Sequence, residues 1–289
     1  MTAPVGYRPP YEHLYIYYLE GLAGAVDSAL GPMFIGNWEE DGYSFLFFSS
    51  PAEETVRQFL EARNDLNLLD RYDMRYDDWQ GGRFQGLRTD RLSIEPAWTA
   101  NAATPAGNDL IVQLDPGVVF GAGTHPTTRD CLAALERLSA DGGGGTLLDL
   151  GTGTGVLALA AARLGWRRVL AVDFNRLAAR TANHNVKINA LEDRVLAVHG
   201  RAEDLVACPA EAVVANIHYD VLHALIRSDG FRRCPRWILS GLLRSQAREV
   251  EAYLAAAGFA IRQRWSRDNI WFTYLGVSET VEKGRSPKL

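Results

Sequence analysis

The chain has 289 residues, a length that corresponds to two domains or to one large one. Hydrophobic residues make up 47% and charged residues 22%, so the chain can form a packed core and is not generally disordered. Thirty basic and thirty-five acidic side chains give a formal net charge of −5, which argues against a protein that mainly binds a nucleic-acid backbone.

The first 76 residues show alternating strand and helix patterns. The expected elements are a strand at 13–19, a short helix near 22–30, a hairpin of strands at 33–38 and 43–48, a helix from 50 to about 64 and a strand at 68–76. Ser50 is the expected N-cap of that second helix, with Pro51 at its first position and Glu53 completing a capping box. This order predicts a small α+β domain with a ferredoxin-like topology.

Residues 77–90 are rich in glycine and charge and have no periodicity, so we expect a linker between domains there. From residue 146 onward, strand and helix patterns alternate with the spacing of a parallel sheet. Strands are expected at 146–150, 169–173, 195–199, 212–215 and 237–240, helices at 155–164, 176–189, 219–228 and 245–257, and a final antiparallel hairpin at 259–265 and 270–275.

These patterns predict an α/β fold with a doubly wound, mostly parallel, seven-stranded sheet that ends in an antiparallel hairpin. The expected boundaries are 1–76 for the small domain, 91–276 for the large one and 277–289 for a flexible tail. Three cysteines form no CxxC pair, so we expect no metal site and no disulfide framework. No apolar run approaches the roughly 18–20 residues of a membrane span, and residues 1–13 lack the charged-then-apolar layout of a secretory signal, which favours a cytoplasmic protein.

The strongest local motif is LLDLGTGTG, residues 147–155, which is followed by an apolar helix pattern. A strand that runs into a glycine turn and then into a helix lets the backbone approach a ligand closely. Asp173 lies 18 residues after Gly155 at the end of the next expected strand, where a carboxylate accepts hydrogen bonds from ribose hydroxyls. The arrangement predicts an adenosine-binding site.

The spacing of the glycines bears on which adenosine ligand binds. The dinucleotide fingerprint is GxGxxG, whereas this chain has a GxGxG turn preceded by Asp149. That pattern is associated with S-adenosylmethionine, whose cationic groups benefit from an acidic neighbour. An ordinary tight turn is the alternative reading of the glycines. Glu203 and Asp204 are expected beside the adenine, with a solvated loop as their alternative.

A second motif, DPGVVFGAGTHPTT, occupies residues 115–128 and reads as a glycine-rich loop that enters a helix. It resembles the signature of the PrmA family, bacterial methyltransferases of a ribosomal protein, whose usual form is DPGxAFGTGTHPTT. This chain departs from it at Val119 and Ala122. The segments LLDLGTGTGVLALAAARLG, AVDFNRLAARTANHNVKIN, VVANIHYDVL and ILSGLLRSQAREV resemble further motifs of the family, in order, between about residues 91 and 276.

The resemblance implies transfer of methyl groups from S-adenosylmethionine to lysine ε-amines of a basic large-subunit ribosomal protein, with an N-terminal α-amine as a further acceptor. It implies a monomer without a direct nucleic-acid requirement, and a substrate-recognition role for the small domain. The implied catalytic residues are Asn216, which would orient the amine, and His218. The implied cofactor contacts are Thr128, Gly151, Gly153, Asp173, Asn216, Asp149, Phe120 and Glu203.

The stretch before the segment SIEPAW, residues 93–98, is shorter than the family pattern, which bears on the choice of substrate. Three alternatives stay open at this point, and the glycine spacing argues against the second of them. The first is a methyltransferase of the same family that acts on another protein or a small amine. The second is an NAD-dependent dehydrogenase with a similar sheet, and the third is a non-catalytic module that keeps the ligand pocket.

Overall fold

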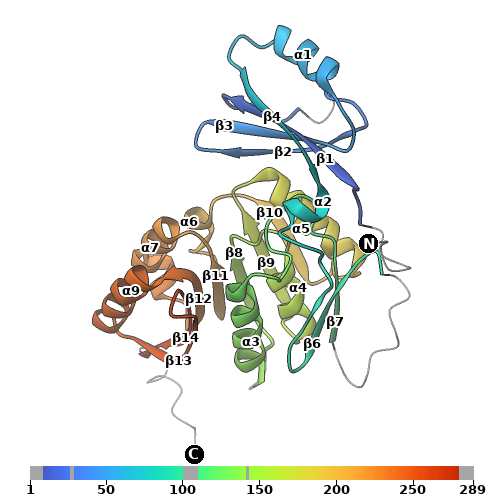
Figure 1. Cartoon of the computed structure of the whole chain (residues 1–289). Coiled ribbons are helices and arrows are strands. Elements are labelled where there is room, and N and C mark those ends of the chain that lie inside the picture. The colour runs from blue at the N-terminus through green and yellow to red at the C-terminus, as the bar shows by residue number, and fades with distance from the viewer. Residues whose placement is uncertain (1–8, 27–28, 100–109, 141–142, 280–289) are drawn as a thin grey trace, which may run out of the picture.

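The computed structural model describes residues 9–26, 29–99, 110–140 and 143–279, which form three sheets and their flanking helices (Figure 1). The N-terminal sheet contains β1 (His13–Glu20), β2 (Phe34–Glu40), β3 (Tyr43–Phe48) and β4 (Asn67–Arg75), with α1 (Glu53–Glu61) on one face. Its order is β2-β3-β1-β4 and all neighbours are antiparallel. This is the strand order of a ferredoxin-like topology and confirms that prediction.

Two details of this unit were predicted wrongly. Among the described residues of 22–30, turns and bends replace the expected helix, and Gly21 and Gly24 adopt positive φ values of 98° and 75°, which a helix does not allow. Helix α1 begins at Glu53 and not after Ser50. The Tyr17 hydroxyl accepts the backbone N–H of Ala52 at 2.8 Å, so a contact with β1 replaces the local cap.

A three-stranded sheet follows, which the sequence patterns did not reveal. The short helix α2 (Tyr76–Trp79) and strand β5 (Leu87–Arg88) lie in or beside the segment expected as a linker, and β6 (Leu92–Pro96) and β7 (Leu110–Leu114) form a parallel pair beside β5. These strands are two to five residues long, too short for their periodicity to stand out in the sequence.

The large sheet has the order β10-β9-β8-β11-β12-β14-β13. Its strands are β8 (Thr146–Leu150), β9 (Arg168–Asp173), β10 (Val195–His199), β11 (Ala212–Asn216), β12 (Arg236–Leu243), β13 (Phe259–Arg267) and β14 (Trp271–Ser278). The first five are parallel, and β13 and β14 form the antiparallel hairpin, so the predicted fold class is confirmed. Strand β14 includes Val277 and Ser278 of the expected tail, and residues 280–289 lie outside the described ones.

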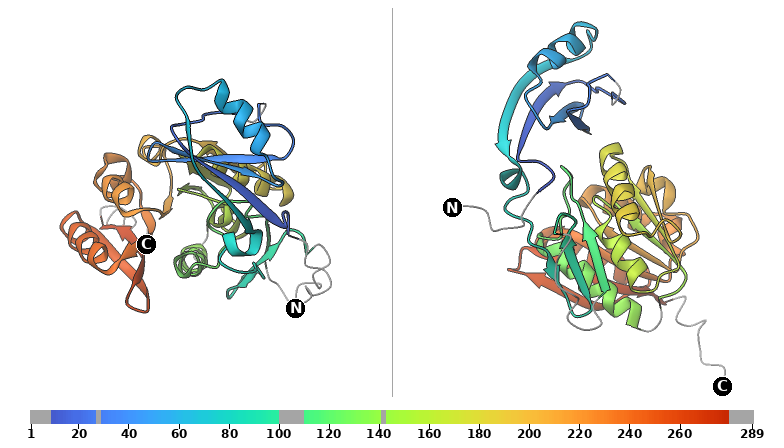
Figure 2. Two further views of the ribbon diagram at one scale, coloured as in Figure 1. Left: turned by 45° about the horizontal axis from the view of Figure 1, so that its top comes forward. Right: turned by 90° about the vertical axis from the view of Figure 1, so that its right-hand side faces the viewer.

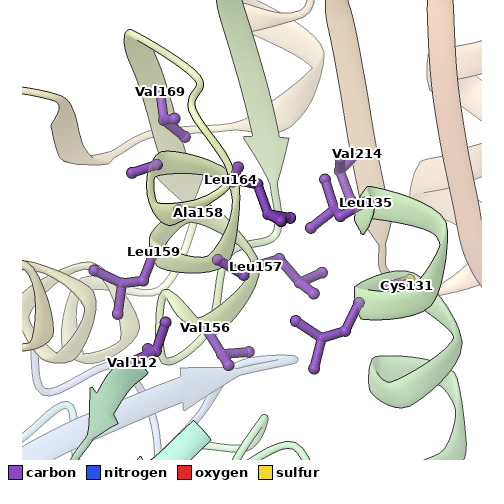
Figure 3. Close-up of a cluster of buried hydrophobic side chains, with 14 of the residues drawn as sticks. Val112, Cys131, Leu135, Val156, Leu157, Ala158, Leu159, Leu164, Val169 and Val214 are labelled. Atoms are coloured by element: carbon purple, nitrogen blue, oxygen red, sulfur yellow. The ribbon is translucent and has the colours of Figure 1, made fainter. Parts of the chain in front are cut away.

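Helices cover both faces of this sheet, as its apolar strands require (Figure 2). One face packs against α3 (Pro126–Ala140), α4 (Val156–Arg163) and α5 (Arg176–Ile188), and the other against α6 (Ala202–Leu205), α7 (Tyr219–Arg227), α8 (Asp229–Arg232) and α9 (Arg244–Ala256). Figure 3 shows side chains of α3 and α4 gathered with Val112 of β7 and Val214 of β11. No helix of the described residues is long and apolar enough to span a bilayer.

Two buried asparagines, Asn185 of α5 and its C-cap residue Asn189, join this helix to β7 and to the loop that follows it. The Asn189 amide accepts from the backbone N–H of Gln113 at 2.9 Å and donates to its carbonyl at 2.7 Å. The Asn185 amide accepts from the N–H of Asp115 at 2.9 Å and donates to the carbonyls of Asp115 and Thr154, both at 2.8 Å. Asn189 therefore acts as a hydrogen-bonding partner of the β7 backbone, and Asn185 of the residue that follows it, in place of a neighbouring strand.

We expect Asn185→Ala to lower the free energy of unfolding by about 2–3 kcal/mol, because it leaves one buried N–H and two carbonyls without their partner. Urea unfolding measures the effect. Asn183→Ala is the matched control, since Asn183 is an exposed asparagine of the same helix. Equal losses in the two variants would contradict the role of Asn185.

Candidate active site

The glycine turn lies where β8 ends and α4 begins. Gly151, Gly153 and Gly155 have φ values of 75°, 55° and 86°, so each adopts a conformation that side chains disfavour. A Cβ atom at Gly151 would lie 1.9 Å from Cγ2 of Ile217, and one at Gly153 would lie 2.9 Å from the Phe120 carbonyl. The turn therefore touches both the segment after β11 and the loop after β7, and glycine is required at both contacts.

Asp173 ends β9, and its carboxylate faces the glycine turn. One oxygen accepts the N–H of Gly153 and the other accepts the N–H of Asn175, each at 2.9 Å. The side chain is 7% exposed, and this burial raises the pKa of the carboxyl group, partly offset by the two backbone hydrogen bonds. The structure thus places the glycine turn next to Asp173, as the sequence predicts. The carboxylate oxygens of Asp173 keep lone pairs for further donors.

Asp149 lies beneath the same turn at the end of β8 and is fully buried. The Thr152 hydroxyl donates to its Oδ2 at 2.6 Å, while Oδ1 has no hydrogen-bond partner among the described residues. Burial raises the pKa of Asp149 to about 7, and the nearby charge of Asp173 adds to this shift. An unpartnered buried carboxylate oxygen is suited to a cationic ligand, because a positive charge would offset the cost of its burial.

This pKa shift makes a contribution to stability that depends on pH. Between the ordinary value of 3.8 and about 7, the folded chain holds a proton on Asp149 that the unfolded chain has released. The free energy of unfolding therefore falls as pH rises through this window. Urea unfolding of the wild type and of Asp149→Asn measures this effect. We expect the difference between their free energies of unfolding to change by about 2 kcal/mol between pH 5 and pH 7. Parallel pH profiles of the two proteins would contradict it.

The loop of residues 115–125 runs from β7 to α3 over the glycine turn. The Thr154 hydroxyl donates to the Gly121 carbonyl at 2.7 Å and holds the loop against the turn. Phe120 is 70% exposed, whereas Thr128 is buried in the first turn of α3. The His125 ring lies edge-on to Trp271, 4.9 Å between ring centres, and its burial lowers its pKa.

Asn216 ends β11, beside Ser240 of β12, at the carboxyl edge of the sheet. The following residue, Ile217, contacts the glycine turn, so Asn216 lies near the expected cofactor contacts. The His218 side chain is 78% exposed, and its Nδ1 lies 3.4 Å from a carboxylate oxygen of Asp220. Glu203, in α6, forms an ion pair with Arg201 at 2.8 Å and lies past the end of β10.

Phe174 and His199 also lie at this edge, and the sequence analysis had not selected them. Phe174 is exposed and directly follows Asp173, and its carbonyl lies 2.9 Å from Nε2 of His199. Both line a cavity of about 450 Å³ between the β9–α5 turn and the β2–β3 hairpin, together with Asn175 and Glu39. The signal available in the sequence for Phe174 was an aromatic residue directly after the Asp173 carboxylate. Across the described residues, no group of three or more His, Cys, Asp or Glu side chains could hold a metal ion.

The strand order, the glycine turn after β8 and the carboxylate after β9 define a Rossmann-like methyltransferase fold. The family model of the ribosomal protein L11 methyltransferases (PrmA) matches residues 55–278. The chain therefore belongs to this family, and the resemblance of its motifs is confirmed.

Individual relatives agree. The "Ribosomal protein L11 methyltransferase" of Anoxybacillus flavithermus is 36% identical over 198 residues, which cover 66% of this chain and 61% of that protein. The protein of the same name from Listeria monocytogenes serotype 4b is 32% identical over 247 residues, covering 78% and 77%. A crystal structure of ribosomal protein L11 methylase from Lactobacillus delbrueckii subsp. bulgaricus has a TM-score of 0.57 and 29% identity, covering 68% of this chain and 99% of that one. The matches span 56–61% of the lengths of the A. flavithermus, Desulforamulus reducens and Pelotomaculum thermopropionicum proteins.

Proposed function

We propose that the protein transfers methyl groups from S-adenosylmethionine to lysine ε-amines of ribosomal protein L11, with an N-terminal α-amine as a further acceptor. Membership of the PrmA family is the observation that carries this proposal. The relatives are named for this substrate, and the chain has the glycine turn and strand-end carboxylate of an adenosine site. A second candidate, methylation of another protein or a small amine by the same site, is favoured by the shortened segment before residue 93.

The residues present fit the proposed cofactor. Asp173 has lone pairs for ribose hydroxyls, and the unpartnered oxygen of Asp149 suits a cationic ligand. Gly151 and Gly153 let the turn lie against Ile217 and the Phe120 carbonyl, where a Cβ atom has no room. Further proposed contacts are Phe120, Thr128, Glu203 and Asn216. When bound, S-adenosylmethionine would supply a methyl carbon on a sulfonium, from which the neutral thioether S-adenosylhomocysteine leaves as the amine attacks.

The chain's own contribution is to position and desolvate the amine. A lysine amine has an ordinary pKa of about 10.4, and only its neutral form has a lone pair for attack. An apolar surrounding lowers that pKa, and holding the amine in line with the methyl carbon lowers the entropic barrier. We propose that the side-chain carbonyl of Asn216 accepts a hydrogen bond from the amine and orients it. His218, exposed beside Asp220, is proposed to line the entrance for the amine.

We propose that residues 1–76 form the substrate-recognition domain, 77–90 a linker and 91–276 the catalytic domain. Residues 1–76 carry twelve acidic and five basic side chains, whereas the rest of the chain has a slight basic excess. A strongly acidic unit attracts a basic ribosomal protein and speeds their encounter. The proposal includes a cytoplasmic monomer that acts without a nucleic acid or a membrane.

The test incubates the purified protein with labelled S-adenosylmethionine and unmethylated L11, and mass spectrometry locates the label. We expect labelled lysines in the wild type and a rate at least about tenfold lower in Asn216→Ala. Asn183→Ala, a change at an exposed position of α5 outside the proposed recognition domain, is the matched control and keeps the wild-type rate. Cofactor binding without label on L11, but with label on other proteins of a cell extract, would support the second candidate instead.

A further inference from the structure

Three side chains from helix α2 and its C-cap donate hydrogen bonds to the loop over the glycine turn. The Tyr76 hydroxyl donates to the Gly117 carbonyl at 2.7 Å, and the Gln80 amide donates to the same carbonyl at 2.9 Å. The indole N–H of Trp79 donates to the Val118 carbonyl at 3.0 Å. Residues at or next to the predicted linker therefore bind two consecutive carbonyls of the loop of residues 115–125, which we call the cofactor loop.

Trp79 also makes two aromatic contacts, one with a residue of the N-terminal sheet and one with a residue of the loop after β7. Its ring lies 5.1 Å from that of Phe47 in β3, at an interplanar angle of 66°. Its ring also lies 5.9 Å from that of Phe120, at an interplanar angle of 42°. Phe47 is buried in the N-terminal sheet, and Phe120 is the exposed loop residue proposed to contact the cofactor. Trp79 thus connects the N-terminal sheet with the cofactor loop.

The loop is held differently on its other sides. Asn185 binds the backbone of Asp115 at its start, and Thr154 binds the carbonyl of Gly121 at its end. Between these two points, α2 and Gln80 hold the carbonyls of Gly117 and Val118. The side chains of Val118 and Val119 are buried in the same cluster as Phe47 and Tyr76. The course of the loop next to Phe120 therefore depends on the position of α2.

We propose that Trp79 is a positioning residue for the cofactor: its indole N–H and ring fix the loop and direct the Phe120 ring toward the bound nucleoside. This inference rests on the proposed function, since it requires that the site binds S-adenosylmethionine or its product. Phe120 is 70% exposed, so without a neighbouring ring its side chain samples several rotamers, and ordering it on binding costs free energy. By holding the Phe120 ring before the ligand binds, Trp79 reduces that cost. Because Trp79 also contacts Phe47, the N-terminal sheet is connected to the position of the Phe120 ring.

The test is a double-mutant cycle in which calorimetry measures the Kd for S-adenosylhomocysteine. Trp79→Phe keeps a ring but removes the indole N–H, and we expect it to raise the Kd about fivefold, the effect of one lost hydrogen bond. Phe120→Ala is expected to raise the Kd by a similar factor. Because Trp79 acts through Phe120, the double variant is expected to match Phe120→Ala alone, with the two effects not multiplying.

Trp38→Phe is the matched control. Trp38 is the tryptophan of β2, and its indole N–H donates to Glu40 of the same strand. We expect it to leave the Kd unchanged, while both tryptophan variants keep the thermal unfolding temperature of the ligand-free protein within a few degrees. Wild-type affinity in Trp79→Phe, or effects that multiply in the double variant, would overturn the inference alone. A wild type that does not bind S-adenosylhomocysteine would overturn the proposed function, and the inference with it.

Discussion

Replacing Asp173 by asparagine is expected to raise the Kd for S-adenosylhomocysteine about hundredfold, equivalent to about 2.7 kcal/mol. The two carboxylate oxygens of Asp173 accept backbone N–H groups from Gly153 and Asn175. An asparagine has one oxygen and one NH₂ group, so one of these N–H groups would face a donor instead of an acceptor. The variant therefore loses the acceptor for a ribose hydroxyl and also disturbs the glycine turn.

Calorimetry measures the affinity, and circular dichroism verifies that the variant is folded. Asp193→Asn is the matched control, because Asp193 is an exposed carboxylate just before β10, at the end of that strand away from Asp173. We expect its Kd to stay within a factor of about two of the wild type. A change of less than threefold in Asp173→Asn would show that the nucleoside binds elsewhere.

Replacing Arg267 by alanine is expected to lower the free energy of unfolding by about 4 kcal/mol. The Asp130 side chain is 1% exposed, and its Oδ1 accepts from Nε of Arg267 at 2.9 Å and from a terminal nitrogen at 2.7 Å. The second oxygen has no hydrogen-bond partner within the described ranges. Asp130 in turn raises the pKa of Arg267, which keeps the guanidinium charged. Removing the arginine would leave an uncompensated charge in the core.

Chemical unfolding of two further variants makes this prediction specific. Arg264 lies on the same strand, its side chain is also 52% exposed, and it pairs with Glu251 at 3.6 Å. Because Glu251 is partly exposed, we expect Arg264→Ala to cost about 1 kcal/mol or less. The double variant Arg267→Ala, Asp130→Asn is expected to recover part of the loss, since it removes the buried charge. A double variant less stable than Arg267→Ala would contradict the explanation.

The Arg267–Asp130 pair also bears on the candidate site. It joins the end of β13 to α3, and the contact between Trp271 and His125 joins the start of β14 to the residue before that helix. The first turn of α3 contains Thr128, one of the proposed cofactor contacts. The C-terminal hairpin therefore positions the start of α3. Asp130 and Arg267 are 137 residues apart, so the sequence offers no local signal for this contact.

The central sheet was predictable because its signals are local. The strand at Thr146–Leu150, the glycine turn and Asp173 belong to one β-α-β unit of about thirty residues, in which spacing along the chain determines what meets in space. The parallel strands were recognised from continuous apolar runs. The predicted start of α1 was wrong for the opposite reason, since Tyr17 of the distant strand β1 accepts the Ala52 N–H group that a local cap at Ser50 would bind.

The sequence by itself determined the order of the central strands and helices, the glycine turn with its carboxylate, and the family, because these depend on periodicity and on short spacings. The tertiary structure alone decided that α2 holds the loop beside Phe120, that Asn185 replaces a strand partner, and that Asp130 meets Arg267. It also decided the raised pKa of Asp149, since burial by distant segments sets the cost of its charge. Hydrogen bonding and desolvation act over a few ångströms in space, and only folding brings those groups together.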